Sequence, residues 1–346
     1  MALVLGLVEV CYAKPVKTGY APVNGLQMYY EVYGSSGGMP LVLLHGGDPT
    51  IETSFGHVIE AFAKHRQVIA FEQQGHGHTA DVDRPFSFDQ SADDTVALLG
   101  YLKIDKADFM GYSNGGHIAI AIALKHPDVV RKLIIESAMF DRSGGDPAFW
   151  ESFKNPTLET MPKELREAYL KTAPHPDQLQ SYFDKSVRRM REFKGWTPEQ
   201  IRSIQAPTLV LCGDHDVVRP EHAVETFRLL PHGQLAILPM TDHFGMADRR
   251  DWVPSMVDTF LDAPMPAAAP ATPVASESDL VTLFRSMKYK THLHLSLFNG
   301  NEVDATFRSF DQSREIIWVN AVDSSGAFSK KAYPLRDLKN VSQTVH

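Results

Sequence analysis

The chain has 346 residues, a formal net charge of −8 and two cysteines. An acidic balance provides no basic surface for a polyanion, so nucleic acid is not an expected partner. Two cysteines cannot build a disulfide framework, and no CxxC spacing indicates a metal cluster. The chemistry expected below needs neither a metal nor an organic cofactor.

Residues 1–13 come first in chain order and are mostly apolar. They end in Cys11-Tyr12-Ala13, which is typical of the apolar core and small-residue cleavage site of a signal peptide. Glu9 interrupts the apolar run, however, and no basic residue precedes it. Two alternatives therefore stay open, namely an exported protein (periplasmic or secreted) and a cytoplasmic one with a plain apolar N-terminus. No segment is long enough to span a bilayer, so no membrane span is expected.

Short apolar strands alternate with helical stretches over residues 14–262. This alternation predicts an α/β fold, in which helices cover both faces of a mostly parallel sheet. The predicted strands are residues 27–33, 41–44, 68–71, 107–110, 132–135, 208–212 and 234–238, and the predicted helices are residues 92–102, 116–124, 221–230 and 252–261.

Residues 141–196 break the alternation, because they contain three helical stretches and no strand-like run. We predict a helical cap here, inserted after one strand of the sheet. Its many aromatic and methionine side chains favour an apolar acyl or aromatic substrate over a charged one. We expect Phe140, just before the cap, and Trp150, within it, to contact that substrate. The three stretches are near residues 148–154, 163–172 and 177–193.

The texture changes again at residues 263–276, which are rich in alanine and proline and predict a semi-rigid linker. Residues 277–346 then predict a small all-β, barrel-like module. Because Lys and Arg are nearly matched by Asp and Glu there, we expect it to dock a protein partner or a second copy of the chain, not RNA. The predicted elements are a helix at 279–287, strands at 292–298, 304–310 and 315–322, and turns at 299–300 and 324–326.

The sequence Gly111-Tyr112-Ser113-Asn114-Gly115 matches the pattern G-x-S-x-G. It follows a predicted strand and opens a predicted helix, which is the setting of a nucleophile elbow. Glycines flank Ser113 because a tight strand-to-helix turn leaves no room for side chains beside it. The helix N-terminus presents the backbone N–H of Asn114 to a developing oxyanion. The alternative is a serine that only caps the helix.

A serine nucleophile needs a base, and the base needs an orienting carboxylate. His243 follows the predicted strand at 234–238, and Asp216 follows the one at 208–212. Both therefore lie past the carboxyl ends of parallel strands, where open α/β sheets place their sites. Asp214 and Glu136 are the competing candidates for the acid.

A second oxyanion donor should come from the loop after the strand at 41–44. That loop begins His45-Gly46-Gly47, and we predict the backbone N–H of Gly47, because glycine lets the backbone approach a bound carbonyl closely. Asp48 beside it is either a helix N-terminal residue or a substrate contact. We also expect Phe244, which follows His243, to contact substrate.

With these parts in this order, residues 19–262 resemble the α/β-hydrolase fold, in particular its capped bacterial esterases, proline iminopeptidase-like peptidases and C–C bond hydrolases. One position departs from the pattern. Members commonly carry Asp-x-Arg-Gly-x-Gly-x-Ser, whereas this chain reads Glu72-Gln73-Gln74-Gly75-His76-Gly77-His78-Thr79. Gln74 replaces the arginine, so the ion pair of that arginine is absent. The C-terminal module resembles a small SH3-like or Sm-like barrel.

These observations lead us to expect a serine hydrolase that cleaves a small-molecule carboxylic ester through an acyl-enzyme. The catalytic residues would be Ser113, His243 and Asp216, with oxyanion donors at Gly47 and Asn114. Peptide or C–C bond cleavage on the same residues is the alternative among enzymes. A non-catalytic ligand receptor or adaptor is the alternative of another class, and it would predict a broken Ser-His-Asp set.

Overall fold

The computed structural model describes residues 13–35, 37–47, 50–266, 284–285, 292–297, 302–311, 313–322 and 328–343. The chain divides into two compact units, Met1–Met265 and Pro266–His346, and each is described by itself. Several predictions lie outside the described residues. These are the signal-peptide segment up to residue 12, Asp48, most of the Ala/Pro-rich stretch, most of the helix at 279–287, and the turns at 299–300 and 324–326.

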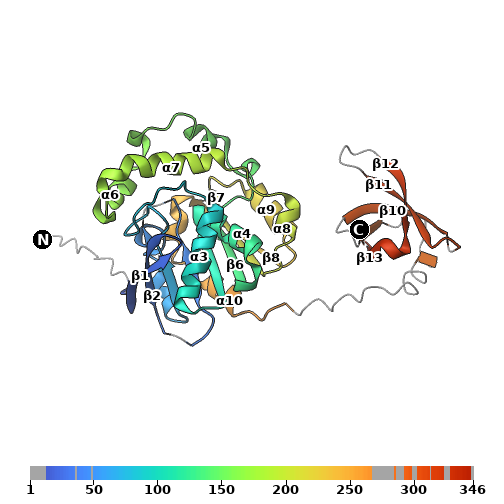
Figure 1. Ribbon diagram of the computed structural model, residues 1–346, viewed down its shortest axis with the longest axis horizontal. Coiled ribbons are helices and arrows are strands. Elements are labelled where there is room, and N and C mark those ends of the chain that lie inside the picture. The colour runs from blue at the N-terminus through green and yellow to red at the C-terminus, as the bar shows by residue number, and fades with distance from the viewer. Residues whose placement is uncertain are drawn as a thin grey trace, which may run out of the picture. The chain divides into compact units, whose positions relative to one another are not determined.

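The larger unit is built on an eight-stranded sheet in the order β1-β2-β4-β3-β5-β6-β7-β8 (Figure 1). From β4 to β8 every neighbouring pair is parallel. The prediction of a mostly parallel α/β sheet is therefore confirmed. The strands are β1 (Lys17–Val23), β2 (Leu26–Tyr33), β3 (Leu41–Leu44), β4 (Val68–Phe71), β5 (Ala107–Tyr112), β6 (Val130–Glu136), β7 (Thr208–His215) and β8 (Gly233–Asp242).

The antiparallel end of the sheet differs from the predicted pattern. Strand β1 was not predicted, and it pairs antiparallel with β2, which in turn pairs antiparallel with β4. Asn24 and Gly25 join β1 to β2 and both have positive φ, 48° and 85°. An Asn-Gly pair with two positive φ angles makes the tight hairpin turn whose twist matches that of the flanking strands.

Helices cover both faces of the sheet, and alternate strand residues supply one core to each. Val42 and Leu44 pack with α3 and α4 on one face, whereas Leu41 and Leu43 pack with α1, α2 and α10 on the other. Strands buried on both faces read as continuous apolar runs, which is why they were predictable. The helices are α1 (Ile51–Phe55), α2 (Ile59–Ala63), α3 (Phe88–Leu102), α4 (Asn114–Lys125), α8 (Pro198–Arg202), α9 (Pro220–Leu229) and α10 (Val253–Asp262).

Between β6 and α8 the chain forms the helices of the predicted cap, which lie beyond one end of the strands (Figure 1). The longest, α7, turns its apolar side chains towards the sheet domain, where Tyr182, Val187 and Met190 are buried. The cap helices are α5 (Pro147–Ser152), α6 (Lys163–Thr172) and α7 (Leu179–Glu192). The 3-10 turns of this unit are η1 (Pro127–Val129), η2 (Arg142–Gly144), η3 (Leu158–Thr160), η4 (Pro176–Gln178) and η5 (Phe244–Asp248).

The smaller unit is a five-stranded antiparallel sheet in the order β12-β11-β10-β9-β13. Its core contains Phe284, Leu295, Phe307 and Val319. Three strands agree with the prediction, and the last two lie in a segment where no separate strand was predicted. The strands are β9 (His292–Leu297), β10 (Glu302–Asp311), β11 (Ile316–Val322), β12 (Phe328–Pro334) and β13 (Leu338–Gln343), with a 3-10 turn η6 (Leu335–Asp337) before the last.

Candidate active site

Ser113 occupies a strained turn between β5 and α4. Its φ and ψ angles are 53° and −118°, a combination that non-glycine residues seldom adopt. The flanking glycines are required by close backbone contacts. A Cβ on Gly115 would lie 1.8 Å from the carbonyl oxygen of Leu44, and a Cβ on Gly111 would lie 2.1 Å from that of Gly115. The turn therefore holds Ser113 in one position at the end of the sheet.

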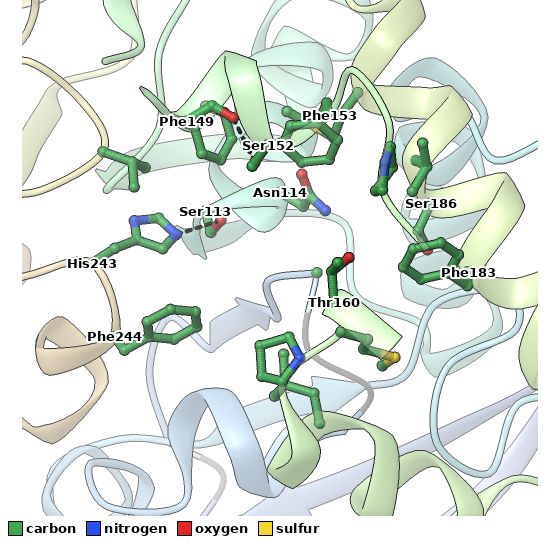
Figure 2. A pocket seen from close by; sticks show the side chains of 18 of the residues that line it. Ser113, Asn114, Phe149, Ser152, Phe153, Thr160, Phe183, Ser186, His243 and Phe244 are labelled. Carbon is green, nitrogen blue, oxygen red and sulfur yellow. Dashed lines mark hydrogen bonds between the residues drawn. The ribbon is translucent and has the colours of Figure 1, made fainter. Parts of the chain in front are cut away.

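Ser113, His243 and Asp216 form one chain of hydrogen bonds. The Ser113 hydroxyl lies 3.0 Å from Nε2 of His243, and Nδ1 of His243 lies 2.7 Å from Oδ1 of Asp216. Figure 2 shows His243 turned towards Ser113 across this bond. Asp216 directly follows β7 and His243 directly follows β8, so the parallel register of these two strands brings them together.

The carboxylate of Asp216 is buried and fully occupied. Oδ2 accepts hydrogen bonds from the Ser137 hydroxyl at 2.5 Å and from Gly213 N at 3.4 Å, and Oδ1 accepts one from Val218 N at 3.3 Å. Burial alone would raise the pKa of Asp216, but the hydrogen bonds from His243 and Ser137 outweigh burial and lower it. The group is therefore ionised at neutral pH and can hold the imidazole in one orientation.

The two competing carboxylates have other surroundings. Asp214 Oδ1 lies 2.8 Å from Nδ1 of His215 and accepts a hydrogen bond from Thr241 N at 3.1 Å. The Thr241 bond and the contact with His215 lower the pKa of Asp214 to about 2. Glu136 is buried, and burial together with the charge of Asp216 raises its pKa to about 8. Nδ1 of His243 faces Asp216 and neither of these groups.

We expect Glu136→Gln to stabilise the protein at pH 8 more than at pH 5. Between its usual value of 4.5 and about 8, the folded state keeps a proton on Glu136 that the unfolded chain releases. Stability contributed by the protonated group is therefore lost as pH rises through this window. Glutamine does not titrate, so the advantage of the variant should grow by on the order of 3 kcal/mol across it. Urea unfolding of the variant and the unmodified protein at pH 5 and pH 8 measures this advantage. If the two proteins differ in free energy of unfolding by the same amount at both pH values, the prediction is contradicted.

The loop after β3 is fixed by hydrogen bonds of His45 and Gly46 and by a close contact of Gly47 with α4. Gly46 N donates to the Ser54 hydroxyl at 3.1 Å. Nδ1 of His45 lies 2.8 Å from the Gly46 carbonyl, and its Nε2 accepts from Gln73 N at 2.9 Å. A Cβ on Gly47 would lie 2.8 Å from the side-chain nitrogen Nδ2 of Asn114, so the loop packs directly against the start of α4. As the first residue of that helix, Asn114 has a backbone N–H without an intrahelical acceptor.

Tyr112 packs on the face of the His243 ring and also binds its backbone. Its ring stacks on the imidazole with centroids 5.3 Å apart, and its hydroxyl donates to the His243 carbonyl at 2.8 Å. This contact was not anticipated, because Tyr112 occupies a position of the G-x-S-x-G pattern that any residue can fill. It restrains both the ring and the backbone of His243.

A cavity of about 520 Å³ opens from Ser113 towards the cap. The described residues that line it include no Lys, Arg, Asp or Glu. Figure 2 shows Phe149, Phe153 and Phe183 around it, with Phe244 near His243. A cavity of this size, with a mostly apolar surface and no charged group among its described lining residues, suits an uncharged, largely apolar ligand.

The four predicted substrate contacts have different positions. Phe244 lines the cavity and is 59% exposed, whereas Asp48 lies outside the described residues. Trp150 does not line the cavity, because its Nε1 donates to the Arg142 carbonyl and its ring lies under the Arg142 guanidinium. Phe140 is fully buried and stacks on His222 at 4.3 Å. Neither Trp150 nor Phe140 therefore lines the cavity beside Ser113, since both rings are used in packing.

Two buried basic side chains near the cavity were not predicted. His117 lines the cavity one turn after Ser113, and burial, followed by the charge of Arg189, lowers its pKa to about 3. It is therefore neutral. Arg189 lies on α7 over the rings of Phe86 and Phe88, and its Nε and Nη2 find no hydrogen-bond partner among the described residues. Tyr182, Ser186 and Arg189 are four and three residues apart, so they share one face of α7. This spacing is the sequence pattern from which the inward position of Arg189 could have been predicted.

Gln74, at the position where the resemblance expects arginine, is buried in a network of polar side chains. Its amide nitrogen donates to Asp81 Oδ1 at 2.7 Å, and its oxygen accepts from Arg84 Nε at 2.5 Å. Arg84 also pairs with the buried Asp94 at 2.5 Å. Arg84, ten residues later in the chain, thus forms an ion pair with Asp94 beside Gln74, the position at which the family pattern has its own arginine.

The described part of the chain contains no group of three or more His, Cys, Asp or Glu side chains that could hold a metal ion. None of its helices is both long enough and apolar enough to cross a membrane.

Comparisons with known proteins agree with this fold. The sequence model of the alpha/beta hydrolase family matches residues 41–254. The serine hydrolase BPHL of Homo sapiens is 28% identical over 244 residues, 67% of this chain and 82% of that protein. The 2-hydroxy-6-oxo-2,4-heptadienoate hydrolase of Pseudomonas putida is 28% identical over 253 residues, 65% and 90% of the two chains. The solved meta-cleavage product hydrolase of Pseudomonas fluorescens superposes with a TM-score of 0.58 at 22% identity, covering 71% of this chain and 97% of its own.

Proposed function

Since this chain belongs to the alpha/beta hydrolase family, we propose that it is a serine hydrolase that cleaves carboxylic esters through an acyl-enzyme. The observation that carries the proposal is the hydrogen-bonded chain from Ser113 through His243 to Asp216, with distances of 3.0 and 2.7 Å, at the floor of a cavity whose described lining residues include no Lys, Arg, Asp or Glu. A nucleophile, a base and an orienting carboxylate in this geometry are the parts that acyl transfer requires.

Acylation begins when the Ser113 oxygen attacks the ester carbonyl carbon while Nε2 of His243 takes the hydroxyl proton. The carbonyl oxygen becomes an oxyanion, which accepts hydrogen bonds from the backbone N–H groups of Gly47 and Asn114. Asp216 stabilises the imidazolium of His243. The imidazolium then gives its proton to the leaving alkoxide, the C–O bond breaks, and the alcohol departs from an acyl-Ser113.

Deacylation repeats the steps with water as the nucleophile. His243 takes a proton from water, the hydroxide oxygen attacks the acyl carbon, and the same two N–H groups stabilise the second oxyanion. Collapse of this intermediate breaks the bond to Ser113, whose oxygen takes the proton back from His243. The carboxylic acid leaves and the free enzyme is restored.

The cavity supports an ester in preference to a peptide with a free amine. A charged ammonium group needs a carboxylate near it when it leaves water, and the described lining residues include none. The rings of Phe149, Phe153 and Phe183 instead supply apolar area for an acyl chain or an aromatic group. An aminopeptidase on the same residues is therefore the less well supported alternative.

A panel of short- and medium-chain p-nitrophenyl esters, assayed beside prolyl p-nitroanilide, tests the choice of bond. We expect the medium-chain esters to give the highest kcat/KM, because longer acyl groups bury more area against the phenylalanine rings. Turnover of the anilide should be undetectable. Anilide turnover with a kcat/KM above that of every ester would refute the ester proposal in favour of a peptidase.

Arg189 favours C–C bond hydrolysis as a second candidate function. Arg189 does not line the cavity itself, but its charge acts on His117, which does. Because this buried guanidinium has no carboxylate partner among the described residues, its field would favour an anionic substrate. One similar protein is named for a substrate of this kind, the carboxylate 2-hydroxy-6-oxo-2,4-heptadienoate.

If that candidate is correct, Arg189→Met should lower kcat/KM for 2-hydroxy-6-oxo-2,4-heptadienoate by about tenfold, because it removes a positive charge that acts on the cavity without lining it. Hydrolysis of neutral p-nitrophenyl esters by the same variant should stay within about threefold of the unmodified protein. Equal losses on both substrates would exclude a role for Arg189 in selecting an anion.

A further inference from the structure

We propose that Tyr182 is a positioning residue that ties cap helix α7 to the oxyanion donor Gly47. The proposal rests on the proposed function, and it starts from one contact. The Tyr182 hydroxyl, carried by the cap, donates a hydrogen bond to the Gly47 carbonyl at 2.8 Å, across 135 positions of sequence.

Gly47 needs such a restraint because glycine has the widest backbone freedom of any residue. Its N–H belongs to the peptide plane that it shares with Gly46, and His45 holds that plane through the Gly46 carbonyl at 2.8 Å. Its carbonyl belongs to the next plane, which Tyr182 holds. The peptide planes before and after Gly47 are thus each held by a hydrogen bond, from His45 and from Tyr182. Together the two bonds set the direction of the Gly47 N–H.

Tyr182 is itself held firmly enough to act as a reference point. It is 3% exposed, and its ring packs against those of His76 at 5.0 Å, Tyr169 at 4.7 Å and Phe86 at 6.1 Å. One turn further along α7, the Lys185 ammonium pairs with Asp81 at 2.6 Å and donates to the Val82 carbonyl at 2.9 Å. The hydroxyl therefore has a defined position only while α7 is seated on the sheet domain.

The consequence is that the cap takes part in catalysis without touching the reacting atoms. When α7 is in place, the Gly47 N–H points to where the oxyanion forms, and when α7 lifts, this restraint is lost. Removal of one oxyanion donor costs about 10²- to 10³-fold in kcat, so loss of its alignment should cost somewhat less. Tyr182 is itself one of the residues that line the cavity, and phenylalanine keeps its ring there, so substrate binding in the ground state should hardly change in Tyr182→Phe.

The test is Tyr182→Phe, which keeps the ring and removes only the hydroxyl. Tyr169→Phe is the matched control, because Tyr169 belongs to the same aromatic cluster and its hydroxyl makes a contact of 3.5 Å with the His175 carbonyl, away from Ser113. For ester hydrolysis we expect Tyr182→Phe to lower kcat by about 10- to 100-fold with KM within about threefold, and Tyr169→Phe to leave kcat unchanged. Equal kcat values for the two variants, or a loss carried by KM, would overturn the proposal.

Hydrogen–deuterium exchange of the peptide that contains residues 45–47 gives a readout independent of turnover. We expect faster exchange in Tyr182→Phe than in Tyr169→Phe or the unmodified protein, because the loop loses one of its restraints. Unchanged exchange would refute the restraint itself. If the unmodified protein hydrolyses no ester while exchange still rises in Tyr182→Phe, the proposed function fails and the tie between α7 and Gly47 stands.

Discussion

Ser113→Ala should lower kcat for ester hydrolysis by about 10⁵-fold, with the fold unchanged. The substitution removes the only atom that can form the acyl-enzyme, and water must then attack the ester directly. Alanine keeps the Cβ, so the strained φ of 53° is the same in both proteins and the turn should be retained. The residual rate would come from the oxyanion donors and from substrate binding.

Ser152→Ala is a suitable control for this experiment, because Ser152 lines the same cavity and its hydroxyl donates only to the Phe149 carbonyl one turn earlier. We expect its kcat to stay within a few-fold of the unmodified protein. Labelling by a fluorophosphonate, which traps activated serines, should be lost in Ser113→Ala and kept in Ser152→Ala. Ester hydrolysis by Ser113→Ala within tenfold of the unmodified rate would refute Ser113 as the nucleophile.

The parts of the site that were predictable are those carried by short stretches of sequence. Ser113 lies between glycines that a tight turn requires, and the apolar strands before Asp216 and His243 end where those residues begin. Parallel register does the rest, because the carboxyl ends of neighbouring strands meet at one edge of the sheet. Nothing beyond pattern and strand order was needed to bring these three residues into one candidate site.

The contacts that hold the site together were not predictable in this way. Tyr182 reaches Gly47 from a cap that is inserted more than a hundred residues later, and no periodicity links the two positions. Phe140 and Trp150 show the converse limit, because aromatic character alone does not tell whether a ring faces a cavity or a neighbouring side chain. The three-dimensional arrangement of the cap and the residues before it decides whether each ring faces the cavity or packs against a neighbour.

The sequence of the first hairpin contains a turn pattern that predicts it. Asn24-Gly25 between two apolar-polar alternating segments is a strong pattern for a tight turn, and it predicts β1 and its antiparallel pairing with β2. A search for continuous apolar runs does not predict strand β1, because Lys17–Val23 has exposed residues at alternate positions and no such run. An edge strand half-exposed to water has little need of one.

Asp216→Asn should lower kcat by about 10⁴-fold while leaving KM nearly unchanged. Asp216 Oδ1 accepts a hydrogen bond from the N–H at Nδ1 of His243, which leaves Nε2 unprotonated and able to take the proton of Ser113. An asparagine that presented its NH₂ group to Nδ1 would favour the other tautomer, and His243 could no longer act as a base. The loss should be greatest near neutral pH and smaller at high pH, where hydroxide can replace the missing base.

Asp214→Asn distinguishes this role from a general effect of negative charge near the site. Asp214 lies two residues away and is ionised, but it contacts His215 and Thr241 and makes no hydrogen bond to His243 among the described residues. We therefore expect a loss of kcat below tenfold. A larger loss in Asp214→Asn than in Asp216→Asn would assign the acid to Asp214. Asp214 is partly exposed to solvent whereas the side chain of Asp216 is fully buried, so the comparison separates the buried carboxylate bonded to His243 from a screened negative charge nearby.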